Sequence, residues 1–219
     1  MRQYIARFIR LMGGLFLYAL GIIFALKANI GYAPWEVFHV GLSSVTGISL
    51  GLITILVGLA VVVITAFLKE KLGLGTILNM IFIGIVIDII NWLDIIPKAT
   101  NMVPGIIMLI AGLFIIALGS YFYMGSAFGA GPRDSLMVAL TRMTKLPVGV
   151  CRAIIELTVM IIGWLLGGMV GIGTVISVFA TGFCIQVTFK LLKFDTTKIQ
   201  HETMDQTFNK LKKANKVTL

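Results

Sequence analysis

The chain has 219 residues, of which 58% are hydrophobic and only 12% are charged. Soluble domains carry roughly 25% charged residues, so this composition indicates a protein whose solvent is the lipid bilayer. The net charge of +9 would suit a nucleic-acid-binding protein. However, the basic residues lie at the ends of apolar runs and in the C-terminal segment, as membrane topology requires, so no nucleic-acid partner is expected.

Six apolar stretches are long enough to cross a membrane, because a spanning helix needs about 20 mostly apolar residues. They are residues 8–28, 50–68, 75–93, 105–127, 148–167 and 173–192. None alternates apolar and polar residues at every second position, as the strands of a membrane barrel do. The sequence therefore predicts an all-α, polytopic membrane protein with six transmembrane helices.

A short additional helix is predicted between the first and second spans. Residues 29–49 are too long for a tight turn and too apolar for a solvated loop. Gly31 interrupts a helix and Pro34 suits the first turn of a new one, which would extend to about Thr46. Its polar stripe, at helical spacing, consists of Glu36, His39, Ser43 and Thr46.

A similar segment, GAGPRDSLM, follows the fourth span. Gly129 and Gly131 interrupt the helix, Pro132 begins a second short helix, and Asp134 occupies the position of Glu36. Both helices are predicted to be amphipathic, and they are either interfacial or re-entrant. A carboxylate in the first turn stabilises a helix N-terminus, and broken helices also form substrate sites in transporters. Both roles remain open for Glu36 and Asp134.

The two segments belong to a longer internal repeat. Residues 13–93 align without a gap with residues 111–191, and more than one position in four is identical. Because each half contains three spans, the second half must enter the membrane from the opposite side. The prediction is two inverted three-helix repeats, an architecture common among secondary transporters. The first repeat covers residues 1–104, the second covers 105–192, and a basic tail covers 193–219.

The distribution of lysine and arginine predicts the orientation. With the N-terminus in the cytoplasm, 15 of the 18 basic residues lie in cytoplasmic segments or the tail. Only Lys27 and Lys98 lie in outer connections, and Arg152 falls within a span. Cytoplasmic loops of membrane proteins carry an excess of Lys and Arg, so both termini are expected in the cytoplasm.

Ionisable residues inside spans are costly and therefore indicate function. Asp88, Arg152 and Glu156 are such residues, and Arg152 and Glu156 can pair because they lie four positions apart on one helix. Together with Arg133, Asp134 and Arg142 they predict a polar cluster on the cytoplasmic side. The cluster either binds an anion or forms a structural ion network. Asp88 is a candidate for proton or cation coupling.

No nucleotide-binding, nucleophile-elbow or zinc motif occurs in the sequence, so neither an enzyme nor a cofactor or metal site is expected. The leading hypothesis is a small-molecule transporter with a path between the halves. Its candidate substrate-binding residues are Glu36, His39, Asp88, Arg133, Asp134, Arg152 and Glu156. The alternative is a membrane scaffold or accessory subunit, whose basic tail would bind a partner protein. The sequence leaves the oligomeric state open.

The segments GYAPWEVFHVGLSSVTGISLG, GTILNMIFIGIVID and GAGPRDSLMVALTRMTKLPVGVCRAIIELTVMIIGWLLGGMVGIGT resemble the YczE-like bacterial integral membrane proteins, grouped with the YyaS and YitT types. The resemblance covers about residues 13–192. The family pattern has glycine in place of Tyr32 and aspartate in place of Glu36. The resemblance implies a multi-pass protein of the bacterial plasma (inner) membrane, and it assigns no molecular activity.

Overall fold

The computed structural model describes residues 2–70, 72–195, 199, 201–207 and 210. These residues form eight helices of 13 residues or more and no strand. The helices are α1 (Arg2–Lys27), α2 (Pro34–Thr46), α3 (Leu50–Phe67), α4 (Leu74–Leu93), α5 (Met102–Gly125), α6 (Pro132–Thr144), α7 (Val148–Leu165) and α8 (Ile172–Leu191). All except α2 and α6 are long and apolar enough to span a membrane. The predicted all-helical fold with six membrane-spanning helices is confirmed.

The helix boundaries follow the local chemistry of the sequence. Both short helices begin at a proline, as predicted, because proline needs no N–H partner in a first turn. Both end at a residue in the left-handed conformation, Gly47 with φ 71° and Lys145 with φ 59°. The first long helix starts at Arg2, six residues earlier than expected. Arg7 and Arg10 are therefore helical residues and not part of a leading coil.

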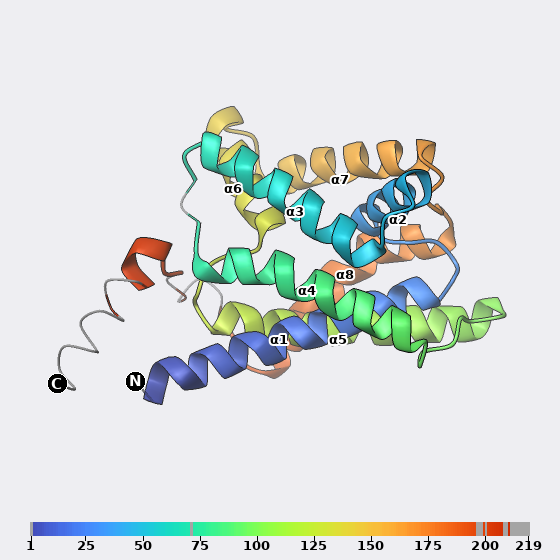
Figure 1. The fold of residues 1–219 in the computed structure, drawn as a ribbon, viewed down its shortest axis with the longest axis horizontal. Helices are drawn as coiled ribbons and strands as arrows, with labels where there is room; N and C mark the ends of the chain where they lie inside the picture. The colour runs from blue at the N-terminus through green and yellow to red at the C-terminus, as the bar shows by residue number, and fades with distance from the viewer. Residues whose placement is uncertain (1, 71, 196–198, 200, 208–209, 211–219) are drawn as a thin grey trace.

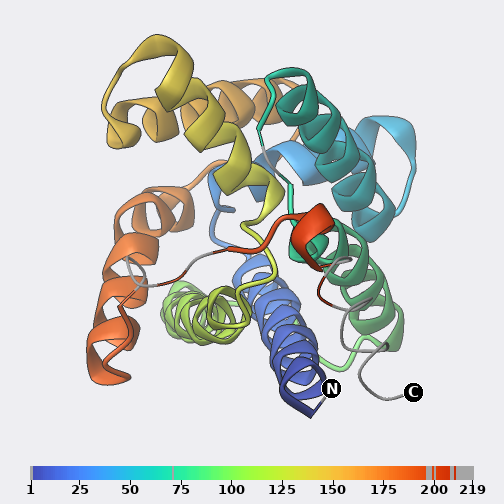
Figure 2. The same cartoon turned by 90° about the vertical axis from the view of Figure 1, so that its left-hand side faces the viewer.

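The helices form two layers (Figures 1 and 2). In one layer α1 and α5 lie side by side, with α4 packed on α1 and α8 packed on α5. The other layer contains α2 packed on α7 and α6 packed on α3. Figure 1 shows α2 at one end of the molecule and α6 at the opposite end. The start of α1 and residues 201–207 of the tail lie at the end where α6 lies.

Close contact between α1 and α5 forms the centre of the fold. A Cβ atom on Gly21 would lie 2.7 Å from the carbonyl oxygen of Gly112, and one on Gly112 would lie 2.8 Å from that of Gly21. Gly14 and Gly119 make the same kind of reciprocal contact. Small residues allow membrane helices to approach closely, so this antiparallel pair is packed backbone to backbone.

The loops that lead into α8 and α4 contact the helix breaks that precede the two short helices, α2 and α6. Before α2, Gly31 (φ 115°) packs on the loop that leads into α8, where the Gly173 N–H donates to the Ile30 carbonyl at 2.7 Å. Before α6, Gly129 (φ 130°) packs on the loop that leads into α4. The matching hydrogen bond there runs from the Gly75 N–H to the Phe128 carbonyl at 2.8 Å. The unusual backbone at each break is therefore held by a loop from the other half of the chain.

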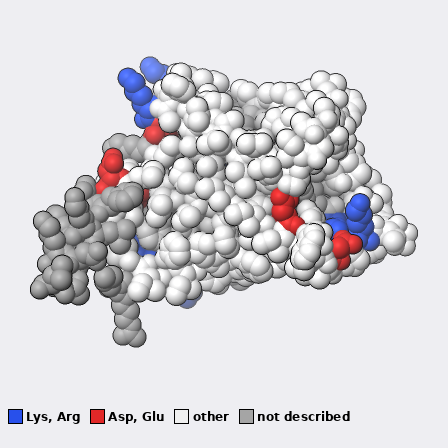
Figure 3. Space-filling view, viewed as in Figure 1, with Lys and Arg blue, Asp and Glu red and all other residues white. Residues whose placement is uncertain are grey.

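The outer surface is apolar over most of its length. Large apolar side chains are exposed on the long helices, including Phe67, Leu165 and Phe179. In Figure 3 the charged side chains of the visible face lie mainly toward the two ends. A helix of 20 residues is about 30 Å long, close to the thickness of the hydrocarbon core of a bilayer. The exposed surface therefore matches a multi-pass membrane protein.

Candidate functional site

A cavity of about 430 Å³ lies between the two layers, at the centre of the molecule. Every helix from α1 to α8 contributes side chains to its wall. The first turns of α2 and α6 enter it from opposite ends, because the glycine-proline breaks direct these turns inward. Small-molecule sites in proteins have about this size, with apolar walls and a few polar groups.

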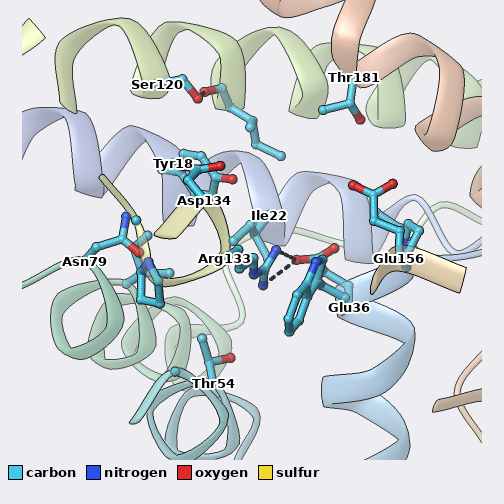
Figure 4. Close-up of a pocket in the computed structure, with 18 of the residues that line it drawn as sticks. Tyr18, Ile22, Glu36, Thr54, Asn79, Ser120, Arg133, Asp134, Glu156 and Thr181 are labelled. Atoms are coloured by element: carbon cyan, nitrogen blue, oxygen red, sulfur yellow. Dashed lines mark hydrogen bonds and ion pairs between the residues drawn. The ribbon is translucent and has the colours of Figure 1, made fainter. Parts of the chain in front are cut away.

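An ion pair joins the two short helices across the cavity. The guanidinium group of Arg133 donates to Glu36 Oε1 from both terminal nitrogens, each at 3.3 Å. The same guanidinium lies 4.7 Å from the ring centroid of Trp35, within the range of a cation–π contact. Figure 4 shows this group of side chains between α2 and the break before α6. The carboxylate of Glu36 therefore lies in the first turn of α2 and binds the opposite half of the chain.

The other charged side chains of the wall are Arg152, Glu156 and Asp134. Arg152 Nε donates to Glu156 Oε1 at 2.8 Å, so the predicted pair on one helix face is confirmed. Asp134 faces the cavity and accepts hydrogen bonds from the Tyr123 hydroxyl, at 3.4 Å, and from the Gly131 backbone. Among the described residues no cationic group lies within 4.0 Å of Asp134. It is therefore the wall carboxylate whose charge is not paired.

Many wall residues come in pairs 98 residues apart in the chain. These pairs include Pro34 and Pro132, Trp35 and Arg133, Glu36 and Asp134, Thr54 and Arg152, Gly58 and Glu156, and Asn79 and Ser177. The spacing equals the offset of the sequence repeat, so equivalent positions of the two halves face the same space. Most pairs differ in chemistry, and the cavity is therefore not chemically symmetric.

The α3–α4 helix pair is tightly packed at the end where α2 lies. Gly51 of α3 contacts the Gly84 carbonyl of α4, and a Cβ atom on Gly84 would lie 2.5 Å from the Gly51 carbonyl oxygen. Asp88 strengthens this contact by accepting from the Ser49 hydroxyl at 2.6 Å and from the Gly51 N–H at 2.7 Å. The backbones of α3 and α4 are therefore in direct contact at this point.

The equivalent pair, α7 and α8, is not packed in this way. Gly149 and Gly182 stand at the positions of Gly51 and Gly84, and a Cβ atom on either would meet no atom within 4 Å. Of the six long helices, α7 is the least buried. The two halves therefore hold equivalent helix pairs in different arrangements, one closed and one open.

The structure separates the residues predicted from the sequence into two groups. The cavity wall includes Glu36, His39, Arg133, Asp134, Arg152 and Glu156. Asp88 is not among the wall residues and instead caps α3. Arg142, predicted to join the polar cluster, pairs with Glu70 at 2.9 Å and donates to the Leu68 carbonyl at 2.6 Å. It points away from the cavity because it lies in the last turn of α6.

Several polar wall residues were missed by sequence reasoning. They are Tyr18, Asn79, Ser120, Tyr123, Ser177 and Thr181. The hydroxyl of Ser177 is buried and has no hydrogen-bond partner within the described part of the chain. A single polar residue in an apolar span is the signal that could have identified them. That signal is weak, because hydroxyl groups in helices also bond to their own backbone, as Ser120 does with the Ile116 carbonyl.

The tail packs near the break that precedes α6. Glu202 accepts from Arg7 at 2.7 Å and from Lys210 at 3.1 Å. Backbone hydrogen bonds run from the N–H of Glu202 to the Ala127 carbonyl and from the N–H of Met204 to the Leu72 carbonyl. Burial alone would raise the pKa of Glu202, but the hydrogen bonds from Arg7 and Lys210 outweigh it and lower the pKa below its ordinary value of 4.5. Lys212, Lys213 and Lys216 of the basic tail lie outside the described residues.

Residues 5–190 match the family described as "Family of unknown function (DUF6198)". The chain is 32% identical to the uncharacterized membrane protein YczE of Bacillus subtilis, over 84% of this chain and 86% of that protein. It is 33% identical to an uncharacterized protein of Haemophilus influenzae, over 75% of each chain. It is 25% identical to the uncharacterized protein YyaS of B. subtilis, over 82% of this chain and 90% of that protein. No solved structure matches the chain.

Proposed function

The chain belongs to the DUF6198 family of membrane proteins, and we propose that it is a small-molecule transporter built from two inverted repeats. The proposed mechanism is alternating access: the repeats open the central cavity first to one side of the membrane and then to the other. The observation that carries this proposal is the difference between the closed α3–α4 pair and the open α7–α8 pair around one cavity.

The helix geometry supports the inverted relationship. Three of the four pairs of helices that correspond under the sequence repeat have equal lengths: 13 residues in α2 and α6, 18 in α3 and α7, and 20 in α4 and α8. The α1 and α5 helices are antiparallel, and α2 and α6 lie at opposite ends of the molecule. The hydrogen bonds at the two breaks also join equivalent positions of the two halves.

The proposed cycle is an exchange of arrangements between the halves. If α7 and α8 adopted the packing now seen for α3 and α4, Gly149 would contact Gly182 and close the end where α6 lies. If α3 and α4 separated in turn, the other end would open. The charge bias favours a cytoplasmic location for both termini. With that orientation the open end of the α7–α8 pair would face the cytoplasm, which supports an inward-open state.

The alternative of a scaffold with a tail that binds a partner has less support. Glu202 and Met204 of the tail bond to residues of this same chain. A scaffold also has no need for a central cavity lined by charged side chains from both halves. We therefore favour a transport role without enzymatic activity.

Access to one residue from both sides of the membrane tests the proposal without knowledge of the substrate. Thr181 lines the cavity, so Thr181→Cys is placed in a background carrying Cys151→Ala and Cys184→Ala. A membrane-impermeant thiol reagent is then applied to right-side-out and to inside-out vesicles. Alternating access predicts labelling in both preparations, with faster labelling from the cytoplasmic side. Labelling from a single side would contradict the proposal.

A bulky residue at the open glycine position provides the second part of the test. Gly149→Leu fits in the present state but would prevent α7 from closing on α8, so labelling from the outer side should be lost. Gly13→Leu is the matched control, because a Cβ atom at Gly13 also meets no atom within 4 Å and α1 does not separate from its neighbours in the proposed cycle. Equal labelling of the two variants from the outer side would refute the proposed gate.

A further inference from the structure

The charges on the wall of the cavity do not cancel. The wall contains three carboxylates, Glu36, Asp134 and Glu156, and two guanidinium groups, Arg133 and Arg152. Glu36 is paired with Arg133 and Glu156 with Arg152. The charge left over is the carboxylate of Asp134, whose described hydrogen-bond donors are neutral. A charge removed from bulk water is unfavourable unless an opposite charge compensates it.

The position of Asp134 is fixed by the fold and is not that of a mobile surface side chain. It lies in the first turn of α6, and its carboxylate projects beside Tyr18 in Figure 4. The Tyr123 hydroxyl and the Gly131 backbone hold it in place. The partial positive charge of a helix N-terminus stabilises the ionised form of such a carboxylate. Burial nevertheless raises the pKa of this carboxyl group, while the guanidinium groups of Arg152 and Arg133 act to lower it. A cation bound beside Asp134 would compensate the burial and favour the ionised form.

The rest of the wall suits an organic molecule. Ile22, Met80, Ile83 and Leu113 provide an apolar surface. Ser177 also lines the wall, and its buried hydroxyl has no hydrogen-bond partner among the described residues. Hard metal cations require several oxygen ligands, and among the described residues no group of three His, Cys, Asp or Glu side chains has the arrangement to hold a metal ion.

We propose that the cavity binds a small monovalent organic cation whose charged nitrogen lies against Asp134. This inference rests on the proposed transport function and names its substrate class. An organic anion would have to separate one of the two ion pairs to find a cation, whereas an organic cation finds Asp134 already unpaired. Aromatic rings attract cations through their negative faces, so Tyr18 and Tyr123 add to this preference.

Protection of Thr181→Cys against a thiol reagent tests the proposal without measuring transport. The ligands are matched in shape and differ in charge: choline and 3,3-dimethylbutan-1-ol, cyclohexylammonium and cyclohexanol, and phenethylammonium and phenethyl alcohol. The anion 3,3-dimethylbutanoate has the same shape as the first two ligands and serves as their negatively charged counterpart. At least one cation should protect the cysteine at a concentration about thirtyfold or more below that needed by its neutral partner. Failure of every cation to protect better than its neutral partner, or stronger protection by the anion, would overturn the proposal.

Variants identify the carboxylate responsible. Asp134→Asn should abolish the preference for the cation, while Asp134→Glu should retain part of it. Asp94→Asn is the matched control, because Asp94 lies outside the cavity and pairs with Lys27 at 2.6 Å. A cation preference that survives Asp134→Asn would refute the assignment. If the cysteine is labelled from both sides and cations protect no better than neutral ligands, the transport proposal stands and the cation proposal is rejected. If cations protect better but labelling occurs from one side only, the cation proposal stands and the transport proposal is rejected.

Discussion

The different packing of Gly51 and Gly149 gives a quantitative prediction about stability. The two glycines occupy equivalent positions in α3 and α7, so the same substitution can be compared in two surroundings. At Gly51 an added methyl group would meet the Gly84 carbonyl, and it would lie 2.5 Å from Cγ of Asp88. At Gly149 it would meet open space. The consequence of Gly→Ala should therefore differ in sign between the two sites.

The magnitudes follow from two opposing effects. Overpacking an already close contact costs about 1–3 kcal/mol, whereas replacing a helical glycine by alanine gains roughly 0.5–1 kcal/mol. Gly51→Ala should therefore lower the free energy of unfolding by about 1–2 kcal/mol, and Gly149→Ala should leave it unchanged or raise it slightly. For a chain of this length, 1 kcal/mol corresponds to a shift of roughly 2–4 °C in the melting temperature.

Thermal unfolding of the purified protein in one detergent measures both variants. A melting temperature about 2–8 °C below that of the parent is expected for Gly51→Ala, and no decrease is expected for Gly149→Ala. If Gly149→Ala were as destabilising as Gly51→Ala, α7 and α8 would be packed like α3 and α4. The asymmetry on which the transport cycle rests would then be refuted.

Two further predictions concern carboxylates outside the cavity. Asp88→Asn weakens the charge-assisted hydrogen bonds that Asp88 accepts from Ser49 and Gly51, so the free energy of unfolding should fall by about 1–2 kcal/mol. Labelling of Thr181→Cys in the cavity from the outer side should also become faster. No change in either measurement would contradict the capping role. Glu202 has a lowered pKa, so its ionised form favours the docked tail; docking should persist above pH 4.5 and weaken as the pH falls below it. Limited proteolysis of the tail over this pH range should show cleavage rising on acidification. Arg7→Met should weaken that dependence, with Lys210 as the remaining cationic partner of Glu202.

Much of the fold follows from sequence patterns that act locally. Length and hydropathy identify the six spans, and the prolines at Pro34 and Pro132 mark the starts of the short helices. The pair of Arg152 and Glu156 is local as well, because the two residues are four apart on one helix. Local patterns of this kind depend on helical geometry alone.

The site depends on contacts that local patterns do not contain. Glu36 and Arg133 are 97 residues apart, and only the packing of the two halves brings them together. Arg142 seemed equivalent to Arg133 in charge, but it lies at the far end of α6 and bonds to Glu70 instead. The sequence repeat also implies equal environments for Gly51 and Gly149. In the structure, however, Gly51 is tightly packed and Gly149 faces open space.

The reciprocal loop contacts have a consequence for how the protein is made. When the ribosome has released only the first half, the break at Gly31 lacks the loop that leads into α8, and the Ile30 carbonyl lacks its partner Gly173. The loop that leads into α4 likewise lacks its contacts with Phe128 and Gly129 until those residues have been synthesised. The break before α6 can therefore be completed as soon as Gly129 has been synthesised, whereas the break before α2 must wait for Gly171 and Gly173. The first repeat thus reaches its final structure only after most of the second repeat has been made.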